Sequence, residues 1–245
     1  MIMRTCCCFI AYICSGVFFT QASTTLGSTR VIYPANEREV TVRLHNPEHR
    51  ATLVQAWIDN GNINATPDDT MSPFIIMPPL VRINAGQGST LKIIFTHQEQ
   101  LPKDKESVFW LNFQDVPPIL KGNENNYMQL AYRTRVKLFY RPEKLPGNSN
   151  QAAKDVNWTV SNNMNGSREL TGCNKSAFYV SLNKIMLTVS QVSYFNNDGG
   201  MIAPAECADF PVTATKKIMA GIDQVDAEWI DDYGALHQQR EALNR

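Results

Sequence analysis

The stretch "YMQLAYRTRVKLFYRP", residues 127–142, determines how the rest of the chain is interpreted. Its alternate residues fall on two faces, which is the period of a β-strand. One face is mostly apolar: Met128, Leu130, Tyr132, Thr134, Val136, Leu138 and Tyr140. The other face is mostly polar or basic: Gln129, Arg133, Arg135, Lys137 and Arg141. A typical strand has about 5–6 residues, so the pattern predicts an unusually long strand with cations along one side.

The residues alone leave two placements open for this strand. At a sheet edge, it would template pairing with another chain, so a protein that keeps such an edge exposed can use it for strand addition. Inside a sheet, it would be long only because it continues into the following linker. The residues also leave two interpretations open for the cations of this strand. They are either charges solvated on the strand face or parts of a binding site.

The flanking sequence predicts further strands and almost no helix. Short alternating segments such as "EVTVRLHNP" (39–47) and "STLKIIFT" (89–96) are separated by turn signals. The segment "RPEKLPGNSNQ" (141–151) contains two prolines and a glycine in a polar context, which is typical of a linker. β patterns resume after it. We therefore predict an all-β fold with two immunoglobulin-like sandwich domains, at residues 23–142 and 143–245.

The first 22 residues have the pattern of a cleavable secretory signal. Arg4 precedes an apolar segment, and the small residues Thr20 and Ala22 follow it. A transmembrane anchor is the alternative, but the apolar segment is shorter than the roughly 20 residues that a spanning helix needs. Four of the six cysteines lie in this segment, which leaves Cys173 and Cys207. Export favours a disulfide between these two over a pair of free thiols.

Composition and motifs argue against several classes of function. Removing Arg4 from the 23 basic residues leaves 22 against 23 acidic residues, so no net field attracts nucleic acid or an anionic membrane. Two cysteines and four scattered histidines do not form a metal ligand set. No nucleotide fingerprint or nucleophile elbow is present. We therefore predict no enzyme activity, no cofactor, no metal site and no membrane insertion.

Six stretches, in order along the chain, resemble periplasmic pilus-assembly chaperones of the chaperone–usher family. They are "STRVIYP" (28–34), "LVQAWID" (53–59), "PFIIMPPLVRI" (73–83), "LPKDKESVFWLNFQDVPP" (101–118), "MQLAYRTRVKLFYRP" (128–142) and "IDDYGA" (230–235). The resemblance implies two immunoglobulin-like domains set at an angle with a cleft between them. It also implies a periplasmic protein that binds and stabilises pilus or fimbrial subunits and delivers them to an outer-membrane usher.

The resemblance also assigns roles to particular residues. Such chaperones lend an edge strand to a subunit that lacks one, and here the donated side chains would be Met128, Leu130 and Tyr132. The family usually has an aliphatic residue where Tyr132 stands. Arg30 and Lys137 match the two cations that hold the C-terminal carboxylate of the subunit, through charge-assisted bonds.

Three further charges match the family's domain interface: Glu106, Arg141 and Asp232. Two other hypotheses stay open. A family member can cap its own edge as a dimer, and an immunoglobulin-like secreted adhesin or receptor fragment would share the predicted fold. Four N-x-S/T sequons, at Asn64, Asn157, Asn165 and Asn174, keep the receptor alternative in view. The charged tail "HQQREALNR" (237–245) leaves the last strand of the second domain unassigned.

Overall fold

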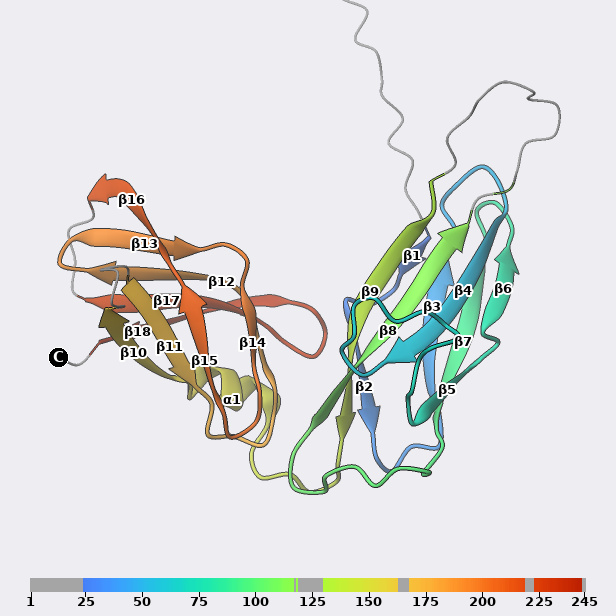
Figure 1. The fold of residues 1–245 in the computed structure, drawn as a ribbon, viewed down its shortest axis with the longest axis horizontal. Helices are drawn as coiled ribbons and strands as arrows, with labels where there is room; N and C mark the ends of the chain where they lie inside the picture. Colours follow the sequence, from blue (N-terminus) through green and yellow to red (C-terminus); the bar gives the residue numbers. More distant parts are fainter. Residues whose placement is uncertain (1–23, 117, 119–129, 163–167, 219–222, 244–245) are drawn as a thin grey trace, which may run out of the picture.

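The computed structural model describes residues 24–116, 118, 130–162, 168–218 and 223–243. These residues form eighteen strands and one short helix. The strands gather into two bodies, β1–β9 and β10–β18, joined at one end (Figure 1). The predicted all-β class with two sandwich domains is confirmed. None of the helices in the described part is long and apolar enough to cross a membrane.

The N-terminal domain packs two sheets against each other. Their strand orders are β1–β3–β7–β5 and β2–β9–β8–β4–β6. The strands are β1 (Thr25–Leu26), β2 (Arg30–Pro34), β3 (Val40–His45), β4 (Thr52–Asp59), β5 (Phe74–Met77), β6 (Leu80–Ile83), β7 (Gly88–Phe95), β8 (Ser107–Val116) and β9 (Tyr132–Arg141). The chain changes sheets between β1 and β2, because β1 pairs with β3 whereas β2 pairs with β9.

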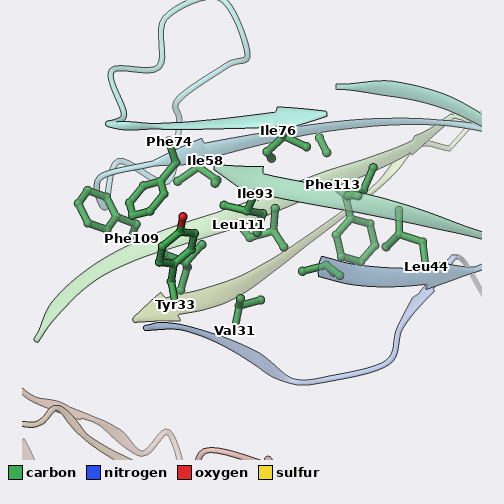
Figure 2. Close-up of a cluster of buried hydrophobic side chains, with 14 of the residues drawn as sticks. Val31, Tyr33, Leu44, Ile58, Phe74, Ile76, Ile93, Phe109, Leu111 and Phe113 are labelled. Atoms are coloured by element: carbon green, nitrogen blue, oxygen red, sulfur yellow. The ribbon is translucent and has the colours of Figure 1, made fainter. Parts of the chain in front are cut away.

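Alternate residues of both sheets fill the core of this domain (Figure 2). Ile93 and Leu111 come from opposite sheets, and both are fully buried. Burying an aliphatic or aromatic side chain of this size stabilises the fold by about 1.5–3 kcal/mol. The buried Tyr33 keeps its hydroxyl satisfied, because the hydroxyl accepts a hydrogen bond from Phe95 N at 3.1 Å and donates to Arg38 O at 3.0 Å.

The C-terminal domain begins with helix α1 (Ser149–Lys154) and contains two sheets. One sheet has the order β10–β11–β15; the other has the order β16–β13–β12–β17–β18, and β14 also pairs with β12. The strands are β10 (Asn157–Asn162), β11 (Arg168–Cys173), β12 (Val180–Val189), β13 (Val192–Asn196), β14 (Gly200–Ile202), β15 (Cys207–Pro211), β16 (Thr213–Ile218), β17 (Gln224–Ile230) and β18 (Leu236–Ala242).

Two elements of this domain differ from what the sequence predicts. Helix α1 begins inside the predicted linker, where the Asn148 side chain accepts a hydrogen bond from Gln151 N at 2.8 Å and caps the first turn. It is too short to show a helical period, and buries only Ala152 and Ala153. The polar tail also forms a strand, β18, because it lies at the edge of its sheet and needs no apolar face.

The predicted disulfide between Cys173 and Cys207 is confirmed. It joins residues that face each other in β11 and β15, inside the C-terminal domain. A bridge of this kind typically stabilises a domain by about 2–4 kcal/mol. The predicted signal, residues 1–22, lies outside the described residues and stays a prediction. The domain boundary at residue 142 also stays a prediction. It would fall between the end of β9 and the start of α1.

Candidate functional site

Strand β9 is half interior and half edge. On one side it pairs antiparallel with β8 along nearly its whole length, from Tyr132 opposite Asp115 to Tyr140 opposite Ser107. On its other side it pairs with β2, in parallel, only over residues 137–141. Residues 132–136 have no partner strand on that side within the described chain, and we call them the open edge. Both placements that the sequence left open therefore apply, each to one half of the strand.

The apolar face of β9 is buried at one end and exposed at the other. Leu138 and Tyr140 lie in the core, whereas Tyr132 is 51% exposed and Leu130, two residues before β9, is 54% exposed. Met128, the third side chain assigned to donation, lies outside the described residues. An apolar stripe that leaves the core and continues along an unpaired edge is a surface that another chain can cover.

Arg30 and Lys137 lie side by side at the point where the open edge ends, and we call them the cation pair. They are register partners in the β2–β9 ladder. Arg30 is buried; its Nη1 donates to Ile230 O at 3.0 Å, and its Nε has no partner within the described chain. Lys137 Nζ donates to Ser181 Oγ at 3.1 Å. Neither cation has a carboxylate within ion-pair distance among the described residues.

Burial and mutual repulsion make this pair chemically suited to an anion. Burial, together with the nearby charge of Arg30, lowers the pKa of Lys137 to about 8. Burial also lowers the pKa of Arg30, although the more distant charges of Asp232 and Asp231 oppose the shift. Two desolvated cations without a counter-ion would gain most from a carboxylate, which accepts charge-assisted hydrogen bonds from both.

The lowered pKa of Lys137 predicts that this residue costs the free protein stability. Between pH 8 and about 10 the unfolded chain binds more protons at this group than the folded chain, so stability rises with pH across that window. At pH 7 the buried ammonium costs on the order of 1–3 kcal/mol. We expect Lys137→Met to raise the free energy of unfolding at pH 7, and to remove part of the rise between pH 8 and 10.

Urea unfolding at pH 7 and pH 9.5 measures both effects. Lys92→Met is the matched control, because Lys92 lies on β7 of the other sheet, and its side chain is 52% exposed and pairs with Glu39. A Lys137→Met protein that is less stable than the wild type at pH 7 would contradict the prediction.

The three charges assigned to the domain interface lie together around Arg141. Its Nε donates to Glu106 at 2.6 Å, and its two terminal nitrogens donate to Asp232 at 2.7 and 2.9 Å. Glu106 also accepts a hydrogen bond from Tyr179 N at 2.8 Å, and Ser149 Oγ donates to Asp232 at 3.0 Å. These contacts join β9 and the residue before β8 to elements of the second domain.

The protonation of this group follows from its burial. Burial raises the pKa of Glu106, and the charge of Arg141 and the bond from Tyr179 only partly oppose it. Asp232 is less enclosed. Burial would raise its pKa too, but hydrogen bonds from Arg141 outweigh this, so the pKa of Asp232 falls below its usual value. Glu106 therefore depends on Arg141 to remain charged.

A further polar cluster lies on the outer face of the sheet that contains β9, and sequence reasoning did not predict it. Arg135 donates to the buried Asp59 at 2.7 and 3.3 Å, and Arg133 donates to Asn112 Oδ1 at 2.7 and 3.0 Å. Asn112 in turn donates to Asp59 at 2.7 Å. These arginines are thus partly buried and not solvated strand charges, which corrects one of the two interpretations above. The sequence signal that could have revealed this cluster was the occurrence of two polar residues, Asp59 and Asn112, within otherwise apolar strands.

Two family models cover both domains of the chain. The model described as "Pili and flagellar-assembly chaperone, PapD N-terminal domain" matches residues 23–146. The model described as "Pili assembly chaperone PapD, C-terminal domain" matches residues 151–241. Together they extend from the start of the predicted mature chain to within β18.

Named relatives and solved structures agree with these models. Chaperone protein FimB/FhaD of Bordetella pertussis is 37% identical over 227 residues, which cover 91% of this chain and 89% of that protein. Chaperone protein HifB of Haemophilus influenzae is 47% identical over 152 residues, which cover 60% of this chain and 62% of HifB. A structure of Salmonella enterica SafA pilin in complex with the SafB chaperone matches with TM-score 0.73 and 26% identity, and covers 90% of this chain and 96% of the matched chain. The chain therefore belongs to the pili assembly chaperone family, which is a family of chaperones and not of enzymes.

Proposed function

We propose that this protein is a periplasmic chaperone that captures pilus or fimbrial subunits by donor-strand complementation and delivers them to an outer-membrane usher. One observation carries the proposal: the open edge of β9 leads directly to the cation pair. The family match and the SafA–SafB complex, which pairs a pilin with a chaperone of the same fold, support a pilus subunit as the partner.

The pairing of β2 determines what kind of strand can add to the open edge. An incoming strand can pair with residues 132–136 but must stop at residue 137, because β2 occupies the ladder from there on. The first residue of β2 is Arg30, so the incoming strand ends against the cation pair. A strand that must end beside two cations is best supplied by a C-terminus, whose carboxylate accepts bonds from both. It would then run parallel to β9, as β2 does.

The exposed apolar residues supply the rest of the binding free energy. Leu130 and Tyr132 would enter the groove that a subunit leaves where it lacks a strand, and the sequence alternation predicts that Met128 would join them. Burying a fully exposed side chain of this size contributes about 1.5–3 kcal/mol, so Leu130 and Tyr132, which are already about half buried, would each contribute roughly half of that. A phenol ring at residue 132 would suit a groove that is wider there than one built for an aliphatic side chain.

Delivery and release are part of the proposal and are supported by the family and by the sequence. The signal pattern of residues 1–22 supports export, and no nucleotide motif is present, so folding of the subunit would drive its release at the usher. The self-capped dimer stays a prediction, which the mass of the free protein in solution tests. An adhesin or receptor fragment would share the sandwiches, but the chaperone models that match both domains favour the chaperone.

Substitutions of the two exposed apolar residues, Leu130 and Tyr132, test the proposal. We expect Leu130→Asp and Tyr132→Asp each to reduce recovery of a co-expressed pilin at least about tenfold, because each places a carboxylate in an apolar groove. Both side chains are half exposed, so the fold should survive. The measurement is affinity purification from periplasm that contains the pilin encoded beside the chaperone gene.

Ile75→Asp provides the matched control. Ile75 is 47% exposed and lies on β5, an edge strand of the other sheet, so a new charge there should leave pilin recovery unchanged. If the Leu130 and Tyr132 variants recovered as much pilin as the wild type, β9 would not be the donated strand.

A further inference from the structure

Four side chains form a row across the sheet that carries the cation pair. Asp59 of β4 lies opposite Trp110 of β8, which lies opposite Lys137 of β9. Lys137 in turn lies opposite Arg30 of β2. Register partners project from the same face of a sheet, so the row places an acid at one end and the cation pair at the other, with an indole between them.

Arg135 lies next to this row and is held by its acidic end. Its guanidinium donates to both carboxylate oxygens of Asp59, at 2.7 and 3.3 Å, and stacks 4.0 Å above the centre of the Trp110 ring. Lys137 Nζ lies 5.9 Å from the centre of the same ring. Asp59 is itself 1% exposed and accepts further bonds from Asn112 and from Gly61 N, both at 2.7 Å. The Nε–Nη2 edge of the Arg135 guanidinium, one of its two bidentate edges, is therefore occupied in the free protein.

Arg135 would otherwise be the strongest competitor for a carboxylate on this face. It lies two residues from Lys137 on the same side of β9, a separation of about 6.6 Å along the strand. Arginine binds carboxylates through two parallel hydrogen bonds, which a lysine cannot match. Arg133, two residues further along, already donates to Asn112 Oδ1 and to Ile63 O at 2.8 Å.

The alternating pattern of β9 cannot by itself prevent a shift to Arg135. Slipping a strand by one residue moves its apolar side chains to the wrong face, so alternation rejects that register. Slipping by two residues keeps every side chain on its own face. A difference between the carboxylate sites at Lys137 and at Arg135 can reject this second register.

We propose that Asp59 sets the register of the captured strand by occupying Arg135, which leaves the Arg30–Lys137 pair as the carboxylate site. Asp59 is thus a positioning residue that never touches the subunit. This inference rests on the proposed function, because it assumes that a C-terminal carboxylate is what the cation pair holds. It explains why that carboxylate would bind at the Arg30–Lys137 pair and not at Arg135.

The test uses synthetic peptides of the C-terminal strand of the pilin encoded beside the chaperone gene. Four peptides are compared: the full strand and a version shortened by two C-terminal residues, each as a free acid and as an amide. When its side chains keep their register, the shortened acid places its carboxylate beside Arg135. On the wild-type protein we expect the full acid to bind at least about 30-fold more tightly than the full amide. The shortened acid and amide should differ by less than about threefold.

The Asp59→Asn variant should release Arg135. We expect it to bind the shortened acid at least about tenfold more tightly than the shortened amide. Adding Arg135→Gln should remove that gain, and this double variant is the matched control. A purely structural role for Asp59 would lower the affinity for all four peptides alike.

The outcomes separate this inference from the proposed function. If the wild-type protein itself preferred the shortened acid over its amide by tenfold, Arg135 would be available and the inference would be wrong while the cation pair kept its role. This comparison needs no variant, so it decides even if Asp59→Asn fails to fold. If the full acid bound no better than the full amide, the carboxylate site of the proposed function would be wrong, and the inference with it.

Discussion

Replacing Arg30 and Lys137 together by Ala should weaken subunit binding by at least about 100-fold. Truncating one partner of a buried, hydrogen-bonded charge pair typically costs 2–5 kcal/mol, mostly through faster dissociation. Both cations are desolvated and lack a counter-ion within the described chain. A carboxylate can therefore bind them without breaking an existing ion pair. Biolayer interferometry with immobilised variants and refolded pilin measures the affinity and the dissociation rate.

The matched control is Lys92→Ala, which removes an exposed cation from the other sheet and should leave binding unchanged. The pH dependence is a second signature. Because the pKa of Lys137 is about 8 in the free protein, wild-type affinity should fall as pH rises above 8, and Lys137→Ala should lack this fall. Unchanged binding by the double variant would mean that the subunit is held elsewhere.

Replacing Arg141 by Met should destabilise the protein by about 3–5 kcal/mol, the largest effect on stability that we expect. Glu106 is 3% exposed, and Arg141 is its ion-pair partner in the described chain. Without the guanidinium, a carboxylate whose pKa is already raised by burial would have to take up a proton or remain buried and unpaired. Asp232 would lose its bidentate partner at the same time.

A second substitution identifies the cause of this loss. Glu106→Gln in the Arg141→Met background removes the unpaired charge but can still accept the hydrogen bond from Tyr179 N, so part of the lost stability should return. Urea unfolding measures the stability, and small-angle scattering reports whether the two domains still hold a single arrangement. A stability loss below about 1 kcal/mol for Arg141→Met would place this group among ordinary surface ion pairs.

The sequence predicted the strand of the site but not its two different halves. Alternation along residues 127–142 identified an amphipathic strand because side chains in a strand repeat every second residue. It could not show that β2, about 100 residues earlier in the chain, covers only residues 137–141. Strand partners so far apart in sequence are fixed by packing of the whole domain, and no local pattern records them.

The row from Asp59 to Arg30 was beyond sequence reasoning for the same reason. Each strand shows which of its own residues share a face, but the alignment of β4, β8 and β9 decides that Asp59 reaches Arg135. The family resemblance assigned Arg30 and Lys137 to one carboxylate site, and the roles of these residues remain proposals. Strand β18 escaped prediction because an edge strand exposed on both faces needs no apolar alternation.

Hydrogen–deuterium exchange of the chaperone with and without its pilin tests the central claim most directly. If an incoming strand pairs with the open edge, backbone amides in a peptide that covers residues 130–136 should exchange more slowly in the complex. A peptide that covers β5, on the other sheet, should be unchanged and provides the internal control. Unchanged exchange over residues 130–136 in a saturated complex would contradict strand donation by β9.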